Sequence, residues 1–164
     1  ILAAVAIPSY NDYTARAQVT EAMNLVSSVK TCFSEAISDR GTIPTLQDCG
    51  VSNDAAAANP GTATLTQTNI GKYLDTIGCA TCVGGALITA APAVVTGTFK
   101  AAGVSTQLSN CNGGGAICVF AIGTADGNNW TCGEASPAGD GVDTNGNVAV
   151  STVPNKLIPG ACKD

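Results

Sequence analysis

An apolar stripe with helical spacing occupies residues 9–40 and constrains the fold more than any other feature. Its side chains recur at alternating intervals of three and four residues, the period of one helix face. The members are Ala15, Val19, Ala22, Val26, Val29, Phe33 and Ala36, with Met23 and Ile37 widening the stripe. Arg40 supplies a cationic last turn and Gly41 a permissive residue after it. The sequence therefore predicts one amphipathic helix that ends near Arg40.

Residues 1–7 are apolar and are followed by Pro8. A proline inside a continuous helix removes one backbone hydrogen bond and bends the rod. We therefore expect one kinked helix over residues 1–40. Seven apolar residues are too few to span a bilayer, which needs about twenty, and they lack the basic region and cleavage site of a signal peptide. The run looks like the cut end of a longer apolar segment.

The remainder of the chain changes character twice. Residues 41–71 are rich in Pro, Gly, Asn, Asp and Ala and predict a surface connector. Alternating threonines at 62, 64, 66 and 68 are as consistent with a lid strand as with an extended loop. Residues 72–132 predict an antiparallel sheet, since short apolar runs alternate with turn residues at 73–79, 86–90, 94–100, 116–124 and 129–132. Asp126-Gly127-Asn128 favours a hairpin between the last two runs.

Residues 133–164 are loop-like apart from an apolar run at 148–153. A single long helix followed by a meander, with no second helix for crossovers, predicts a one-domain α+β fold with the helix against one sheet face. Charged residues make up only 12% of the chain, and seven Lys/Arg face twelve Asp/Glu, for a net charge of −5. This balance argues against non-specific binding of nucleic acid. No histidine is present, which excludes His-dependent triads and His zinc sites, and we expect neither an enzyme nor a cofactor.

Eight cysteines in a charge-poor chain indicate an exported, disulfide-bonded protein. Neighbours in the sequence suggest four pairs, although eight cysteines allow 105 pairings. These pairs are Cys32 with Cys49, Cys79 with Cys82, Cys111 with Cys118, and Cys132 with Cys162. A buried free thiol at Cys32 is the alternative to the first pair, and local and crossed pairing remain open for the middle four. The CxxC at Cys79 to Cys82 has no context for a redox or zinc site, so we favour structural disulfides.

The first 22 residues resemble, without a gap, the N-terminal helix of type IV pilins; their sequence is ILAAVAIPSYNDYTARAQVTEA. Pilins of this family end in a disulfide-closed loop that begins with Trp-x-Cys and finishes with an Ile-Pro-x-x-Cys-like tail. Trp130-Thr131-Cys132 and Ile158-Pro159-Gly160-Ala161-Cys162 are similar to these two elements. The resemblance implies a long kinked N-terminal helix packed on a four-stranded antiparallel sheet, with a disulfide-closed C-terminal loop.

The resemblance also implies a function, that of a structural subunit of an extracellular type IV pilus used in adhesion, twitching motility or DNA uptake. The implied partners are further copies of the chain, the inner-membrane pilus assembly machinery and a host or surface receptor, with no nucleic acid along the shaft. The implied polymerisation helix includes Ile1, Leu2, Val5, Ile7, Pro8 and Tyr10. Family members begin further upstream, so we expect about fourteen residues to be missing from this form, which should then not anchor properly.

The loop of residues 133–162 is the candidate adhesion surface, because the same loop is exposed in the family. Its candidate residues are Asp140, Asp143, Asn145, Asn147 and Lys156. The oxygen-rich run of residues 140–147 fails the EF-hand template and is better explained by turn chemistry. A calcium site there would favour a type II secretion pseudopilin, whereas a Cys132–Cys162 loop disfavours it. The remaining rival is a secreted, disulfide-stapled binding module that forms no filaments.

Overall fold

Helix α1 (Leu2–Arg40) is the longest element of the protein, which we describe from a computed structural model. The structure describes residues 2–50, 65–68, 71–79, 93–111, 115–124, 130–132 and 151–160. At 1.5 Å per residue, the 39 residues of α1 span ~58 Å. The helix is continuous through Pro8, which confirms one long helix, while the kink at Pro8 stays a prediction.

The end of α1 follows the sequence signals. Helix α1 stops at Arg40, and Gly41 adopts a φ of 67°, in the left-handed region that glycine favours. The Gly41 amide donates a hydrogen bond to the Ile37 carbonyl oxygen at 2.8 Å. This bond satisfies one of the carbonyl groups that a helix leaves unpaired at its C-terminus.

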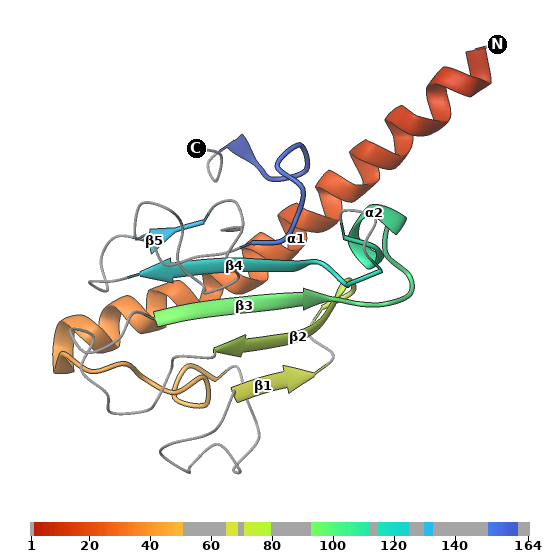
Figure 1. Cartoon of the computed structure of the whole chain (residues 1–164). Helices are drawn as coiled ribbons and strands as arrows, with labels where there is room; N and C mark the ends of the chain where they lie inside the picture. Colours follow the sequence, from red (N-terminus) through yellow and green to blue (C-terminus); the bar gives the residue numbers. More distant parts are fainter. Residues whose placement is uncertain are drawn as a thin grey trace.

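Among the described residues, five antiparallel strands form one sheet in the order β1-β2-β3-β4-β5, so each strand lies beside its neighbour in sequence (Figure 1). The strands are β1 (Leu65–Thr68), β2 (Leu74–Cys79), β3 (Ala93–Phe99), β4 (Val119–Thr124) and β5 (Trp130–Thr131). The α+β class with a long helix and an antiparallel sheet is therefore confirmed. The antiparallel pairing of β4 with β5 agrees with the predicted hairpin, whose turn lies outside the described residues. The run expected at residues 86–90 also lies outside them.

The expected count of four strands is not confirmed, because the sheet has five strands among the described residues. The additional strand, β1, lies in the threonine-rich run within the expected connector and pairs with β2 from Leu65 opposite Cys79 to Thr68 opposite Thr76. Threonine favours strands because its branched side chain suits a pleated surface. The sequence left open whether this run is a strand or an extended loop. Its backbone pairing with β2 shows that residues 65–68 form a strand.

A short second helix, α2 (Thr106–Ser109), follows β3 and was not expected from the sequence. Ser105 caps it, since its side-chain oxygen accepts a hydrogen bond from the Gln107 amide at 3.4 Å. Four residues are too few to show a helical period, which explains why the pattern gave no sign of it.

The core lies between α1 and one face of the sheet. The seven main stripe residues of α1 from Ala15 to Ala36 are at most 7% exposed, and so is Ile37, whereas Met23 is partly buried. In β3, burial alternates, with Ala93, Val95, Gly97 and Phe99 buried. A Cβ added at Gly97 would lie 2.9 Å from the Val26 Cγ2 atom of α1. Glycine at this position therefore allows the helix to approach the sheet closely.

Disulfide bonds link several segments of the chain to one another. Cys32 in α1 is bonded to Cys49, and Cys111 is bonded to Cys118. These are two of the four neighbour pairs that the sequence suggests. Cys79 and Cys132 are also disulfide-bonded, whereas Cys82 and Cys162 lie outside the described residues. The alternative of a free thiol at Cys32 is thus wrong, because the loop after α1 folds back against the helix.

Candidate functional site

Helix α1 is much longer than the sheet on which it packs. The longest of the described strands has seven residues, or ~24 Å at the usual rise of a strand, against ~58 Å for the helix. Figure 1 accordingly shows the N-terminal part of α1 extending beyond the sheet. Tyr10 and Tyr13 lie where the helix leaves the sheet and are 71% and 75% exposed. The protein therefore consists of a head and a projecting helical segment, which we call the arm (residues 2–14).

The predicted polymerisation residues belong to this arm. Leu2, Val5, Ile7 and Pro8 lie in α1, Tyr10 is exposed, and Ile1 lies outside the described residues. Within the described part of the chain, no helix is both long and apolar enough to cross a membrane.

Polar contacts fasten α1 to the head next to the two tyrosines. The Asp12 Oδ1 atom accepts a hydrogen bond from Gln107 Nε2 of α2 at 2.6 Å, and Lys156 Nζ lies 3.4 Å from the same oxygen. Nearby in α1, Gln18 is 5% exposed and its Oε1 atom accepts a hydrogen bond from the Ser105 amide at 2.8 Å. We call these five residues the junction cluster.

The electrostatics of the junction cluster centre on Asp12. The hydrogen bond from Gln107 lowers the pKa of the Asp12 carboxyl below its usual value; desolvation opposes this shift, and Lys156 and Arg16 each lower the pKa by a smaller amount. The side chains of Lys156 and Asp12 are 55% and 43% exposed. Exposed ion pairs contribute little to stability, so this contact orients the two segments more than it stabilises the fold.

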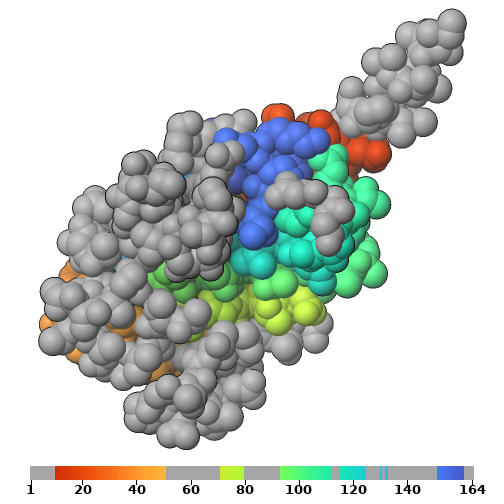
Figure 2. Space-filling view, viewed as in Figure 1, coloured from red at the N-terminus to blue at the C-terminus, as the bar shows by residue number. Residues whose placement is uncertain are grey.

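Lys156 belongs to residues 151–160, which we call the C-terminal strap. The strap is held against the start of β4, where the Thr152 amide donates to the Val119 carbonyl at 2.9 Å and the Val119 amide donates to Thr152 Oγ1 at 2.8 Å. Val153, Leu157 and Ile158 of the strap are buried in the core. Figure 2 shows the strap (blue) beside the exposed surface of α1 (red). Its attachment to β4 therefore fixes the position of Lys156.

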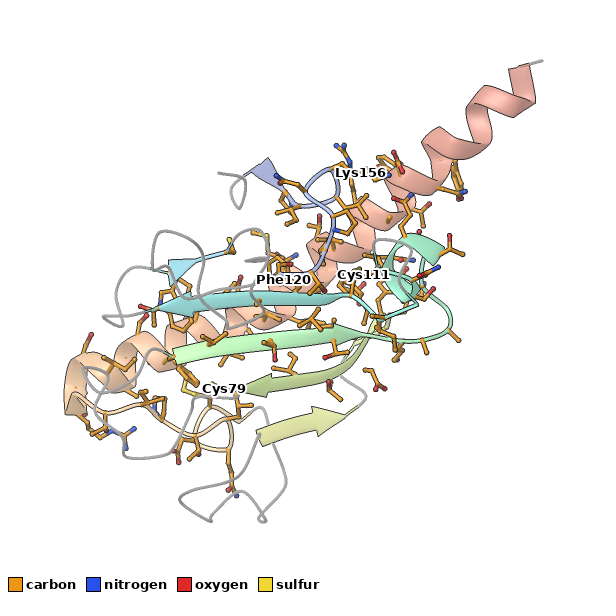
Figure 3. The ribbon with its side chains drawn as sticks, in the orientation of Figure 1. Cys79, Cys111, Phe120 and Lys156 are labelled. Carbon is orange, nitrogen blue, oxygen red and sulfur yellow. A yellow bond between two sulfur atoms is a disulfide. The ribbon has the colours of Figure 1, made fainter. Side chains whose placement is uncertain are left out.

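The candidate adhesion surface is only partly visible. Asp140, Asp143, Asn145 and Asn147 lie outside the described residues, as does the rest of the oxygen-rich run considered for calcium. Lys156 is exposed and points toward α1 in Figure 3. Among the described residues, no group of three or more His, Cys, Asp or Glu side chains could hold a metal ion.

The sequence did not single out the junction cluster as a site. Asp12 and Gln18 fit the polar face of an amphipathic helix, and Gln107 sits in a helix that the pattern did not show. Gln107 and Lys156 are 95 and 144 residues from Asp12. No local spacing connects residues so far apart, so only the folded chain reveals the cluster.

Together these features define an α+β protein in which one long helix packs on an antiparallel sheet and continues past it as an arm. The family described as pilin, a bacterial filament protein, matches residues 15–163. The chain therefore belongs to the pilin family, and the resemblance to type IV pilins is confirmed.

Individual relatives agree with this family. The chain is 31% identical over 170 residues to a fimbrial protein of Neisseria meningitidis serogroup A, covering 100% of this chain and 85% of the relative. It is 30% identical over 168 residues to the type IV major pilin protein PilE1 of Neisseria gonorrhoeae, covering 99% of this chain and 66% of the relative. A fimbrial protein of Pseudomonas aeruginosa is 62% identical over 37 residues, which cover 23% of this chain and 24% of the relative. The chain is thus a structural subunit of a bacterial filament and belongs to a family that is not enzymatic.

Proposed function

We propose that this chain polymerises with itself into an extracellular type IV pilus, with the arm in the filament core and the head facing outward. The observation that carries the proposal is the arm itself, which extends beyond the sheet and exposes Tyr10 and Tyr13 at 71% and 75%. Aromatic side chains such as tyrosine are enriched at protein interfaces. A second copy of the chain is the natural partner for them in a family of filament proteins.

The proposed core contacts come from the apolar side chains at the start of the chain, which are Ile1, Leu2, Val5, Ile7 and Pro8, followed by Tyr10. The small residues Ala3, Ala4 and Ala6 stand between them. Such a segment is compatible both with a bilayer before assembly and with a helix bundle afterwards, because both surroundings are apolar and small residues permit close approach of helices. A subunit held in a bilayer before assembly would be transferred to the filament by an assembly machinery of the inner membrane, which is therefore the second proposed partner.

The filament would serve adhesion, twitching motility or DNA uptake. The similarity to a fimbrial protein and to a type IV major pilin favours a pilus over a type II secretion pseudopilin. The candidate receptor-binding residues are Asp140, Asp143, Asn145, Asn147 and Lys156. The net charge of −5 argues against DNA binding along the shaft.

The test is filament assembly in the cells that make the protein. Tyr10→Asp and Tyr13→Asp place a charge on the exposed face of the arm, and we expect them to abolish filaments seen by electron microscopy while the amount of subunit in the cells stays unchanged. Ala102→Asp, in an exposed turn of the head, is the matched control and should keep its filaments. Normal filaments from both tyrosine variants would overturn the proposed role of the arm.

A further inference from the structure

We propose that Asp12, Gln107 and Lys156 form a polar latch that sets the direction in which the arm leaves the head. The proposal goes beyond filament assembly, since it concerns the single subunit and can be tested without any filament. Among residues 10–50, whose side chains the structure describes, Asp12 is the first that makes a polar contact with another element. It lies three residues before Ala15, the first buried apolar residue of the helix. The latch therefore stands at the boundary between packed and projecting helix.

The side-chain amide of Gln107 can adopt two orientations, and the contact with Asp12 selects one of them. An ionised carboxylate can only accept hydrogen bonds, so the amide must present Nε2 to it, and the contact is short, at 2.6 Å. The Gln107 Oε1 atom is then buried without a hydrogen-bond partner among the described residues. An unpaired buried acceptor is unfavourable, and turning the amide over would place an oxygen against the carboxylate. A charge-assisted hydrogen bond to Asp12 is the interaction that outweighs this cost.

Two separate segments hold the same carboxylate. Gln107 comes from α2, which is itself tied to α1 because the Ser105 amide donates to Gln18 Oε1 at 2.8 Å. Lys156 comes from the C-terminal strap, which is fastened to β4. A carboxylate held from two sides is restrained in two directions, which a single contact could not achieve. Arg16, the remaining charged group that influences Asp12, lies one turn further along α1.

The decisive experiment exchanges donor and acceptor. In Gln107→Glu, two carboxylates face each other, and we expect hydrogen–deuterium exchange of the amides of residues 11–16 to rise about tenfold at neutral pH. In the double variant Asp12→Asn, Gln107→Glu, the amide now sits on α1 and donates to a carboxylate on α2, and exchange should return to the wild-type rate. A role for either residue in helix propensity or bulk stability does not predict this rescue. Exchange of residues 19–29 should stay unchanged in all variants, which separates the latch from global unfolding.

Two further variants complete the test, all measured on the purified, disulfide-intact chain. Thr106→Glu places the same new charge at an exposed position of α2 and should not alter exchange of residues 11–16. Asp12→Ala removes the latch at a partly exposed site and inserts the best helix former, so faster exchange there can only reflect lost contacts. Asp12→Ala also tests the latch if Gln107→Glu does not fold. Absence of rescue in the double variant, equal effects of Thr106→Glu and Gln107→Glu, or unchanged exchange in Asp12→Ala would each overturn the latch.

Discussion

Helix α1 is attached to the head in two physically different ways. From Ala15 to Ile37 it is held by apolar side chains that are at most 7% exposed. At Asp12 it is held by polar contacts to side chains that remain partly open to water. Apolar burial is non-directional and grows with the area removed from water, whereas hydrogen bonds are directional and contribute modestly to stability. The buried apolar residues between Ala15 and Ile37, which we call the apolar seam, therefore determine whether the helix stays on the sheet, and the polar junction, the junction cluster around Asp12, determines how the arm is oriented.

The largest effect should come from removing an aromatic side chain from the apolar seam. Phe33 is fully buried and packs edge-to-face against Trp130, with ring centroids 6.1 Å apart. Phe33→Ala should lower the free energy of unfolding by about 3–5 kcal/mol, measured by urea denaturation. Tyr13→Ala, at a residue of the arm that is 75% exposed, should change it by less than about 0.5 kcal/mol. Similar losses in both variants would show that the two regions do not differ as described.

A covalent bond secures the far end of the seam. The Cys32–Cys49 disulfide joins residues separated by 17 positions and ties the last part of α1 to the loop that follows it. Replacing both cysteines by alanine should cost about 3 kcal/mol, because the unfolded chain regains the entropy of the open loop. Thermal unfolding of this double variant against the wild type measures the loss. An unchanged midpoint would mean that apolar packing alone holds this end of the helix.

The close approach of helix and sheet can be tested at Gly97. An added Cβ would lie 2.9 Å from Val26 Cγ2 and 3.1 Å from Leu74 Cδ1. Gly97→Ala should therefore destabilise the protein by about 1–3 kcal/mol through overpacking. Gly160→Ala, where an added Cβ meets nothing within 4 Å, is the matched control for denaturation experiments. A more stable Gly97→Ala variant would indicate that the space between α1 and the sheet can accommodate the added methyl group.

The smallest effect concerns pH and should be confined to the polar junction. Hydrogen bonding to Gln107 holds the pKa of Asp12 below its usual 3.8. The contact is therefore fully present above the pKa of the unfolded chain and is lost as the pH falls through the lowered folded value. Relative to intrinsic rates, amide exchange of residues 11–16 should increase in this acid range, while residues 19–29 stay protected. Asp12→Asn should abolish the pH dependence; its persistence would assign the effect to another group.

A second acidic group provides a check on this assignment. The Thr45 amide donates a hydrogen bond to Asp48 Oδ2 at 2.9 Å, and the Asp48 amide donates one to Thr45 Oγ1 at 3.1 Å. Hydrogen bonds from the backbone and the side chain of Thr45 to the Asp48 carboxyl lower its pKa as well. Asp48 lies in the loop after α1, at the opposite end of the helix from the arm. Its titration should therefore leave exchange of residues 11–16 unchanged, and Asp48→Asn should retain the pH response of the junction.

Much of the fold could be predicted because its signals are local. The three-and-four spacing of the α1 stripe identified the buried face, and Arg40 with Gly41 marked the end of the helix. The apolar runs at residues 73–79 and 94–100 correspond closely to β2 and β3. In each case the period relates residues that are only a few positions apart, so the pattern can be recognised without knowledge of the rest of the chain.

The sequence by itself determined a long amphipathic helix, an antiparallel sheet and the resemblance to type IV pilins. Only the tertiary structure decided that β1 joins the sheet, that Cys32 is disulfide-bonded and not a free thiol, and that Asp12 meets Gln107 and Lys156. These contacts depend on how whole segments pack once the apolar faces are buried. Residues that lie 95 or 144 positions apart share no period, and their meeting is set by the path of the chain around the core.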